Sequence, residues 1–171
     1  LSLNAAAVRN VGDINKDGYD EVGIVAGSDG DVLDGRTLLS IWSFSSTRPW
    51  LTGIDDQNND DVPDLGVVRE GGDIEVLSGV DGAVLALVTN RDASIDAVAD
   101  VNGDGRQEVL VLPAGGSDFD VYSIPIDLSQ GEVLLTIPRS TQGANHFGAG
   151  VGDLNCDGID DLVLGDDQEA S

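Results

Sequence analysis

The chain has little positive charge to set against its many carboxylates. Lys and Arg together number 8 against 32 Asp and Glu, which gives a formal net charge of −24 over 171 residues. A surface this acidic repels phosphate backbones and anionic lipid heads, so we expect neither nucleic-acid partners nor membrane insertion. Because 40% of the residues are hydrophobic, the charge does not indicate a disordered acidic tail.

Methionine is missing, and Cys156 is the single cysteine. One cysteine excludes an internal disulfide. No apolar run approaches the roughly 20 residues that a membrane-spanning helix needs, and no signal peptide is visible. Since Leu1 is not a translation start, we expect either a processed chain or a piece of a longer polypeptide.

A nine-residue acidic segment occurs four times without gaps. The segments start at Asp13, Asp56, Asp100 and Asp153, so their spacings are 43, 44 and 53 residues. Such spacings are typical of one four-stranded propeller blade per repeat. A short apolar run of strand length follows each segment, and helical periodicity is missing. The sequence therefore predicts an all-β fold of β-propeller blades with four antiparallel strands each.

The repeats delimit one partial domain, 1–171, with each acidic loop joining the first strand of a blade to the second. The clearest later strands are Ile74–Leu77 and Val84–Val88, joined by a glycine-containing turn. The repeats span approximately residues 4–46, 47–92, 93–140 and 145–171. The last one ends after its second strand, so about three and a half blades are expected. An arc of that size cannot close, and we expect the remaining blades to come from the same longer chain or from a partner chain.

The acidic segments have the oxygen pattern of a calcium loop. Calcium takes six to eight oxygen ligands at about 2.3–2.6 Å. In each loop we assign side-chain ligands to positions 1, 3, 5 and 9, counted from the first Asp, and a backbone carbonyl to position 7. The predicted side-chain ligands are Asp13, Asn15, Asp17 and Glu21 in loop 1; Asp56, Asn58, Asp60 and Asp64 in loop 2; Asp100, Asn102, Asp104 and Glu108 in loop 3; and Asp153, Asn155, Asp157 and Asp161 in loop 4. The predicted carbonyl ligands belong to Tyr19, Val62, Arg106 and Ile159. The expected cofactors are thus up to four structural Ca²⁺ ions.

Position 6 of the loops favours a sharp turn. Glycine occupies it in three loops, where a left-handed backbone is needed, and Asp61 replaces it in loop 2. An EF-hand loop also begins Asp-x-Asn-x-Asp-Gly, but it requires a ligand at position 12 and a following helix. Position 12 is apolar here, being Ile24, Val67, Val111 or Leu164, so the helical alternative fails.

The fourth repeat closely resembles a known family. Residues 147–165, from Phe147-Gly148 through Asp153-Leu-Asn155-Cys-Asp157-Gly158 to Gly165, resemble the FG-GAP repeat of integrin α-subunit propellers and related bacterial secreted proteins. The other repeats share the calcium loop and the following strand but lack the Phe-Gly start, and none has the closing Gly-Ala-Pro. The resemblance implies a calcium-stabilised, extracytoplasmic propeller used for adhesion or ligand binding, with the ligand on the face opposite the calcium loops.

Catalytic candidates are few, and we expect no catalytic residues. His146 is the only histidine, and as a lone residue it indicates a turn or surface position. Cys156 occupies position 4 of loop 4, where it is not expected to ligate. Trp42 and Trp50 could form a sugar-stacking platform, although such aromatics more often pack between blades.

The sequence therefore predicts a binding module for a glycan or protein ligand. Two alternatives are a structural or assembly unit of a surface protein or filament, and the propeller of a polysaccharide lyase or hydrolase. Extracellular calcium modules bind in the range of roughly 10⁻⁴–10⁻³ M, which the cytosol does not provide. We therefore expect an extracellular, cell-surface or periplasmic location.

Overall fold

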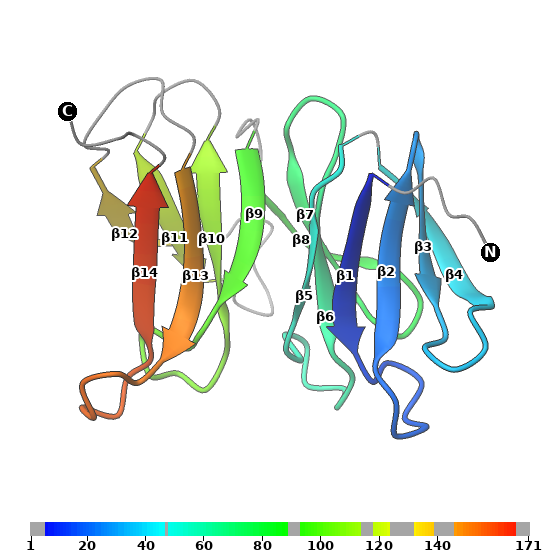
Figure 1. Cartoon of the computed structure of the whole chain (residues 1–171), viewed down its shortest axis with the longest axis horizontal. Helices are drawn as coiled ribbons and strands as arrows, with labels where there is room; N and C mark the ends of the chain where they lie inside the picture. The colour runs from blue at the N-terminus through cyan, green and yellow to red at the C-terminus, as the bar shows by residue number, and fades with distance from the viewer. Residues whose placement is uncertain are drawn as a thin grey trace.

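The computed structural model describes residues 6–46, 48–88, 93–113, 118–123, 132–138 and 146–166. Within these ranges every regular element is a β-strand, from β1 to β14 (Figure 1). The predicted all-β class is confirmed. A membrane-spanning helix is not found in the described ranges.

The strands form four antiparallel sheets, each built from strands consecutive in the chain. Sheet 1 contains β1 (Ala7–Gly12), β2 (Glu21–Ala26), β3 (Asp29–Leu33) and β4 (Ser40–Ser45). Sheet 2 contains β5 (Leu51–Ile54), β6 (Asp64–Val68), β7 (Ile74–Leu77) and β8 (Val84–Val88). Sheet 3 contains β9 (Ala93–Val98), β10 (Glu108–Pro113), β11 (Phe119–Ser123) and β12 (Glu132–Ile137). Sheet 4 contains β13 (His146–Gly152) and β14 (Asp161–Asp166).

The strand order within each sheet follows the sequence. In every sheet the first strand pairs with the second, and the acidic loop connects them. The predicted strands at Ile74–Leu77 and Val84–Val88 are confirmed with these bounds. Each second strand begins at position 9 of its loop, so this residue is both the last residue of the loop and the first of a strand.

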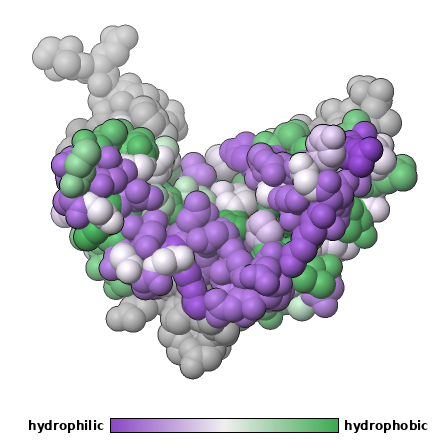
Figure 2. Space-filling model, turned by 90° about the horizontal axis from the view of Figure 1, so that it is seen from below, coloured by the Kyte–Doolittle hydropathy of each residue, from purple (hydrophilic) through white to green (hydrophobic). Residues whose placement is uncertain are grey.

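All four acidic loops lie at one edge of the molecule, the lower edge in Figure 1. Seen from this edge, the described surface is largely hydrophilic, and its outline is an open crescent with a notch on one side (Figure 2). The four sheets therefore form an arc that does not close on itself.

Successive sheets pack through three apolar cores. Sheets 1 and 2 enclose a cluster that includes Val11, Leu51 and Leu65. Sheets 2 and 3 share a second cluster around Ile95, and sheets 3 and 4 share a third around Leu110. At each junction the first and second strands of one sheet contact the first strand of the next. The apolar runs of the two inner sheets, in β6 and β10, are thus buried from both sides.

The side chains at the three junctions are matched in size. A Cβ atom added to Gly23 in β2 would lie 2.8 Å from Leu51 Cδ1 in β5, and one added to Gly66 in β6 would lie 3.1 Å from Ile95 Cδ1 in β9. At the third junction the roles are reversed, because a Cβ atom on Gly148 in β13 would lie 2.4 Å from Leu110 Cδ2 in β10. Each junction therefore pairs one glycine with one large aliphatic side chain.

Candidate metal centres

Five hydrogen bonds recur in all four acidic loops and give them one common shape. The position 5 amide donates to the position 1 carboxylate at 3.0–3.1 Å and to the position 3 side-chain oxygen at 2.8–3.0 Å. The position 6 amide donates to the second oxygen of position 1 at 2.7–2.9 Å. The position 7 amide donates to the position 5 carboxylate at 2.9–3.0 Å. Finally, the position 2 amide donates to the position 9 carboxylate at 2.6–2.8 Å.

These bonds orient the acidic side chains, and both oxygens of the position 1 carboxylate accept backbone amides. Backbone amides hold each carboxylate in place without neutralising its full charge. Loop 2 has the same five bonds as the others, although Asp61 stands at position 6, where the other loops have glycine, and Pro63 stands at position 8.

Two positions of each loop have a left-handed backbone. Position 6 has φ values of 88–89° at its three glycines and 62° at Asp61. Position 4 has the same conformation in every loop, at Lys16, Asn59, Gly103 and Cys156, with φ between 60° and 78°. Sequence reasoning anticipated the turn at position 6 but missed the one at position 4, because its four different residues give no common signal.

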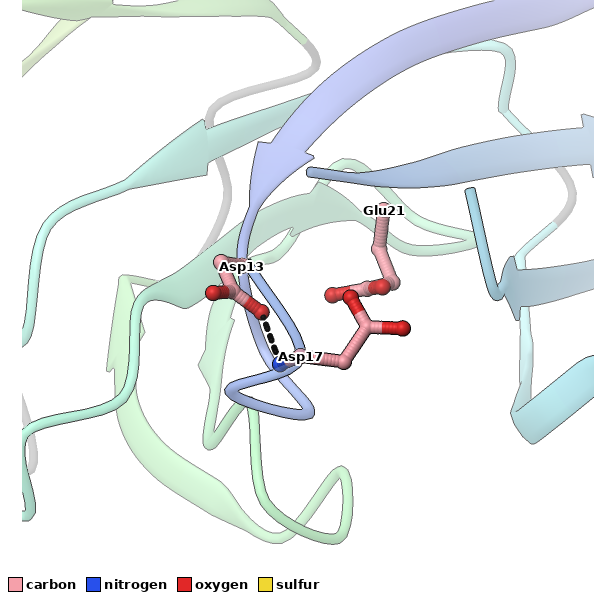
Figure 3. A group of neighbouring side chains, drawn as sticks. All are labelled: Asp13, Asp17 and Glu21. Carbon is pink, nitrogen blue, oxygen red and sulfur yellow. Dashed lines mark hydrogen bonds between the residues drawn. The ribbon is translucent and has the colours of Figure 1, made fainter. Parts of the chain in front are cut away.

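Three carboxylates converge in loop 1 and again in loop 3. Oxygens of Asp13, Asp17 and Glu21 lie within 4.8 Å of one another, as do oxygens of Asp100, Asp104 and Glu108. Figure 3 shows the carboxylates of Asp17 and Glu21 next to each other, with Asp13 bonded to the Asp17 amide. Oxygens bound to one calcium ion at about 2.3–2.6 Å lie at most about 5 Å apart. Each cluster could therefore hold one metal ion.

The position 9 glutamates are the buried members of these clusters. Glu21 and Glu108 are 1% and 0% exposed, whereas Asp17 and Asp104 are exposed. The amide groups of Asn15 and Asn102 bridge to them, donating to Glu21 Oε1 at 2.9 Å and to Glu108 Oε1 at 3.0 Å. In loop 1, Arg36 also approaches Asp17, at 3.7 Å between Nη1 and Oδ2.

Loops 2 and 4 do not bring three carboxylates together in this way, although their residues are described. In both loops position 9 is aspartate, which is shorter than glutamate by one methylene group. Asp64 is fully buried, and its two oxygens accept the Gln57 and Gly79 amides at 2.8 and 2.9 Å. Asp161 is only partly buried and accepts the Leu154 amide at 2.8 Å. From the sequence, loop 2 was the weakest site because of Asp61 and Pro63; in the structure, three carboxylates converge in loops 1 and 3 and not in loops 2 and 4.

The electrostatics of the buried acids reflect the lack of a compensating charge. Burial, together with the neighbouring Asp104 and Asp100, raises the pKa of Glu108 to about 7. Burial likewise raises the pKa of Asp64 to about 6, with a further contribution from Asp60 and Asp56. Among the described residues, no salt bridge reaches Glu108 or Asp64. A cation bound beside these carboxylates would stabilise their charged form.

Hydrogen bonds connect loop 3 to the residues at the start of loop 2. The Asp55 amide donates to Gln107 Oε1 at 3.0 Å, and the Gln107 amide donates back to Asp55 Oδ2 at 2.9 Å. Gln57 Nε2 also donates to Asp55 Oδ1 and, at 3.3 Å, to the Gln107 carbonyl. Burial raises the pKa of Asp55. These contacts join loop 2 to loop 3, and sequence patterns did not predict them because Asp55 and Gln107 are far apart in the chain.

The other candidate residues lie apart from the clusters. Trp42 packs against the core between sheets 1 and 2, and its Nε1 donates to the Gly79 carbonyl at 2.8 Å. Trp50 is 38% exposed. Cys156 is exposed in loop 4. The side chain of His146 lies outside the described residues. The roles of the predicted side-chain and carbonyl ligands stay predictions.

The fold and the loops together define an all-β protein with acidic clusters suited to a metal ion. Comparison with models of known protein families gives no match, and comparison with curated proteins gives none either.

Proposed function

We propose that the acidic loops bind calcium and that the chain is a calcium-stabilised β-propeller module of the FG-GAP type. The observation that carries this proposal is the convergence of three carboxylates within 4.8 Å in loops 1 and 3. All the proposed ligands are oxygens, which suits a hard cation such as Ca²⁺. The loop framework supports the same role at loops 2 and 4, so up to four ions are proposed.

The proposed ion also addresses the charge of the whole chain. Four Ca²⁺ ions would change the formal net charge from −24 to −16. Because self-repulsion opposes a compact state, this neutralisation would stabilise the fold. The proposed role of calcium is structural.

We further propose that the module acts outside the cytosol in adhesion or in binding a glycan or protein ligand. The supporting arguments are the concentration range of extracellular calcium modules and the hydrophilic surface on the side of the loops. A structural or assembly unit is the second candidate, favoured by exposed valines on the two outermost sheets.

A calorimetric calcium titration of the chelator-stripped chain tests the metal proposal. We expect binding in two classes, with the glutamate-ended loops 1 and 3 tighter than the aspartate-ended loops 2 and 4. Glu21→Gln and Glu108→Gln should each remove one tight site and preserve the fold. Glu70→Gln, which removes the same charge from an exposed turn, is the matched control and should change nothing. Unchanged tight binding in both loop variants would contradict the ligand assignment.

A further inference from the structure

A cleft of about 230 Å³ lies at the junction between sheets 1 and 2, at the lower ends of β1 and β5 in Figure 1. Its lining comes from these two strands, from Pro63 in loop 2 and from Gln107 in loop 3. Pockets for drug-sized ligands measure roughly 300–1,000 Å³, so this cleft suits a smaller group or a single side chain. None of the residues assigned to calcium lines it, which makes it a site separate from the candidate metal centres.

The cleft lies where two loop contacts of different chemistry meet. In both contacts the residue just before one loop meets position 8 of the next loop. Between loops 1 and 2 the contact is apolar, because a Cβ atom added to Gly12 would lie 2.8 Å from Pro63 Cγ. Between loops 2 and 3 it is polar, because the backbone amides of Asp55 and Gln107 each donate to the side chain of the other residue. All four residues line the cleft, which therefore has an apolar side and a polar side.

Asp55 supplies the carboxylate of the polar side, and its charge is held by neutral groups. Its Oδ2 accepts the Gln107 amide at 2.9 Å, and its Oδ1 accepts Gln57 Nε2. Among the described residues no salt bridge reaches Asp55. The guanidinium of Arg106, the residue before Gln107, lies instead 3.5 Å from Asn59 Oδ1. Since a carboxylate oxygen can accept two hydrogen bonds, both oxygens of Asp55 can accept one more.

A second carboxylate lies beside the opposite wall of the cleft. Asn10 lines the cleft from β1, and its Nδ2 donates to Asp20 Oδ2 at 2.7 Å. Its Oδ1 accepts the Gly12 amide at 2.8 Å, so the Asn10 side chain is fixed at both ends. With a net charge of −24 on the whole chain, the surroundings of the cleft attract cations and repel anions.

We infer that this cleft binds a primary ammonium group on an aliphatic stem, with the ammonium group on Asp55 and the stem against the apolar side. A positively charged donor is the partner that Asp55 lacks, and charge-assisted hydrogen bonds are stronger than neutral ones. Each Asp55 oxygen already accepts one hydrogen bond. A compact ammonium group therefore suits it better than the planar guanidinium fork, which engages both oxygens at once. Val11, Ile54 and Pro63 provide the apolar lining for the stem.

The same chemistry could come from a free alkylamine or from a lysine side chain of a protein ligand. Either ligand would bind beside the acidic loops without displacing any proposed calcium ligand. The inference thus goes beyond the calcium proposal and does not require the loops to be filled. We expect a weak site, with a Kd on the order of 1–10 mM for a ligand of this size.

The test is an NMR titration of the full chain, labelled with heavy nitrogen, in the presence of calcium and again in chelator. Pentylamine is compared with pentanol, and N-acetyl-lysine methylamide with its norleucine analogue. The two amines should cause saturable shifts of the Gly12 and Gly53 amides and of the Gln107 side-chain amide, and the neutral analogues should not. Binding of both amines indicates that a lysine side chain can enter the cleft, whereas binding of pentylamine alone indicates a free amine.

Substitutions in the cleft separate this site from general attraction to an acidic surface. Asp55→Asn keeps an oxygen acceptor but removes the charge, and should weaken amine binding about ten-fold or more. Asp81→Asn removes the same charge from an exposed turn between β7 and β8 and should bind normally. Gln107→Lys keeps the Asp55 carboxylate but places an ammonium group of the chain itself beside it, so it should also weaken binding about ten-fold or more.

The amide spectrum outside the cleft shows whether each variant is folded. Shifts that spread over the acidic loops without saturating would overturn the inference, as would equal Kd values for Asp55→Asn, Gln107→Lys and Asp81→Asn. Because calcium binding is measured separately in the same samples, a chain that binds calcium but no amine would contradict this inference and leave the calcium proposal intact.

Discussion

Position 9 of the acidic loops determines how the carboxylates of each loop are arranged. Where it is glutamate, in loops 1 and 3, the longer side chain reaches the carboxylates of positions 1 and 5. Where it is aspartate, the carboxylate still accepts the position 2 amide, but three carboxylates do not converge in the loop. The ligand pattern at positions 1, 3, 5 and 9 could be read from the sequence. The division of the four loops into two pairs was also visible in the sequence, because position 9 is glutamate at Glu21 and Glu108 and aspartate at Asp64 and Asp161.

The raised pKa of Glu108 gives the metal-free chain a defined pH dependence. Its pKa is about 7 in the folded chain against an ordinary value of 4.5, so between these pH values the folded chain holds a proton that the unfolded chain releases. The free energy of unfolding should therefore fall as pH rises through this window. The stabilisation from the proton held by Glu108 is lost above about pH 7. Glu108→Gln should reduce the fall by about 1–3 kcal/mol. Urea unfolding in chelator at about pH 5 and about pH 8 measures it.

Glu70→Gln is the control for this pH dependence, because it removes an exposed carboxylate from a turn. It should leave the pH slope unchanged. Equal slopes for Glu108→Gln and Glu70→Gln would show that the buried carboxylate does not retain its proton. The remaining slope in Glu108→Gln is expected from Asp64, whose pKa is about 6.

At the scale of strands, the apolar runs predicted the elements well, because each run is short, rich in branched side chains and bounded by glycine or acidic residues. What they could not predict is the packing between sheets. Whether a glycine such as Gly66 faces a large side chain depends on a residue in another sheet, Ile95. The bulges before Gly12 and Gly152 were also not predicted from the sequence, because they depend on the register between paired strands.

Exchanging one junction pair for another tests this size matching. Gly66→Leu alone should overpack the junction between sheets 2 and 3 and lower the free energy of unfolding by about 1–3 kcal/mol. Ile95→Gly alone should leave a cavity and lower it by about 3–5 kcal/mol. Together the two substitutions reproduce the natural Leu110–Gly148 arrangement. The double variant should therefore lose about 1–3 kcal/mol less free energy of unfolding than the sum of the two single losses. Urea unfolding of the four chains measures the coupling.

A matched pair shows whether the recovery depends on contact. Gly66→Leu combined with Val8→Gly also pairs an insertion with a deletion, but Val8 is 52% exposed and lies in sheet 1, away from the junction between sheets 2 and 3. The effects of this second pair should add without recovery. A similar coupling in both pairs would mean that the glycine and the isoleucine are not matched partners.

For the whole molecule, the arrangement of the loops matters more than any single loop. Four acidic loops gather at one edge, and hydrogen bonds join them, for example between Lys16 Nζ and the Asp60 carbonyl at 3.4 Å. The four loops contain 15 of the 32 Asp and Glu residues, so a chain with a net charge of −24 gathers much of its repulsion at this edge. Monovalent salt can only screen this repulsion, whereas a bound divalent ion would remove its source.

Thermal unfolding distinguishes screening from specific binding. Calcium at about 100 times its Kd should raise the free energy of unfolding by about 2.7 kcal/mol for each filled site. In a chain of this length that corresponds to a rise in Tm of about 5–10 °C per site. Sodium chloride at equal ionic strength should give a much smaller rise, and Mg²⁺ an intermediate one, because it demands octahedral geometry and gives up its waters reluctantly. Equal shifts with all three salts would mean that the loops respond to ionic strength alone, and calcium would then have no structural role.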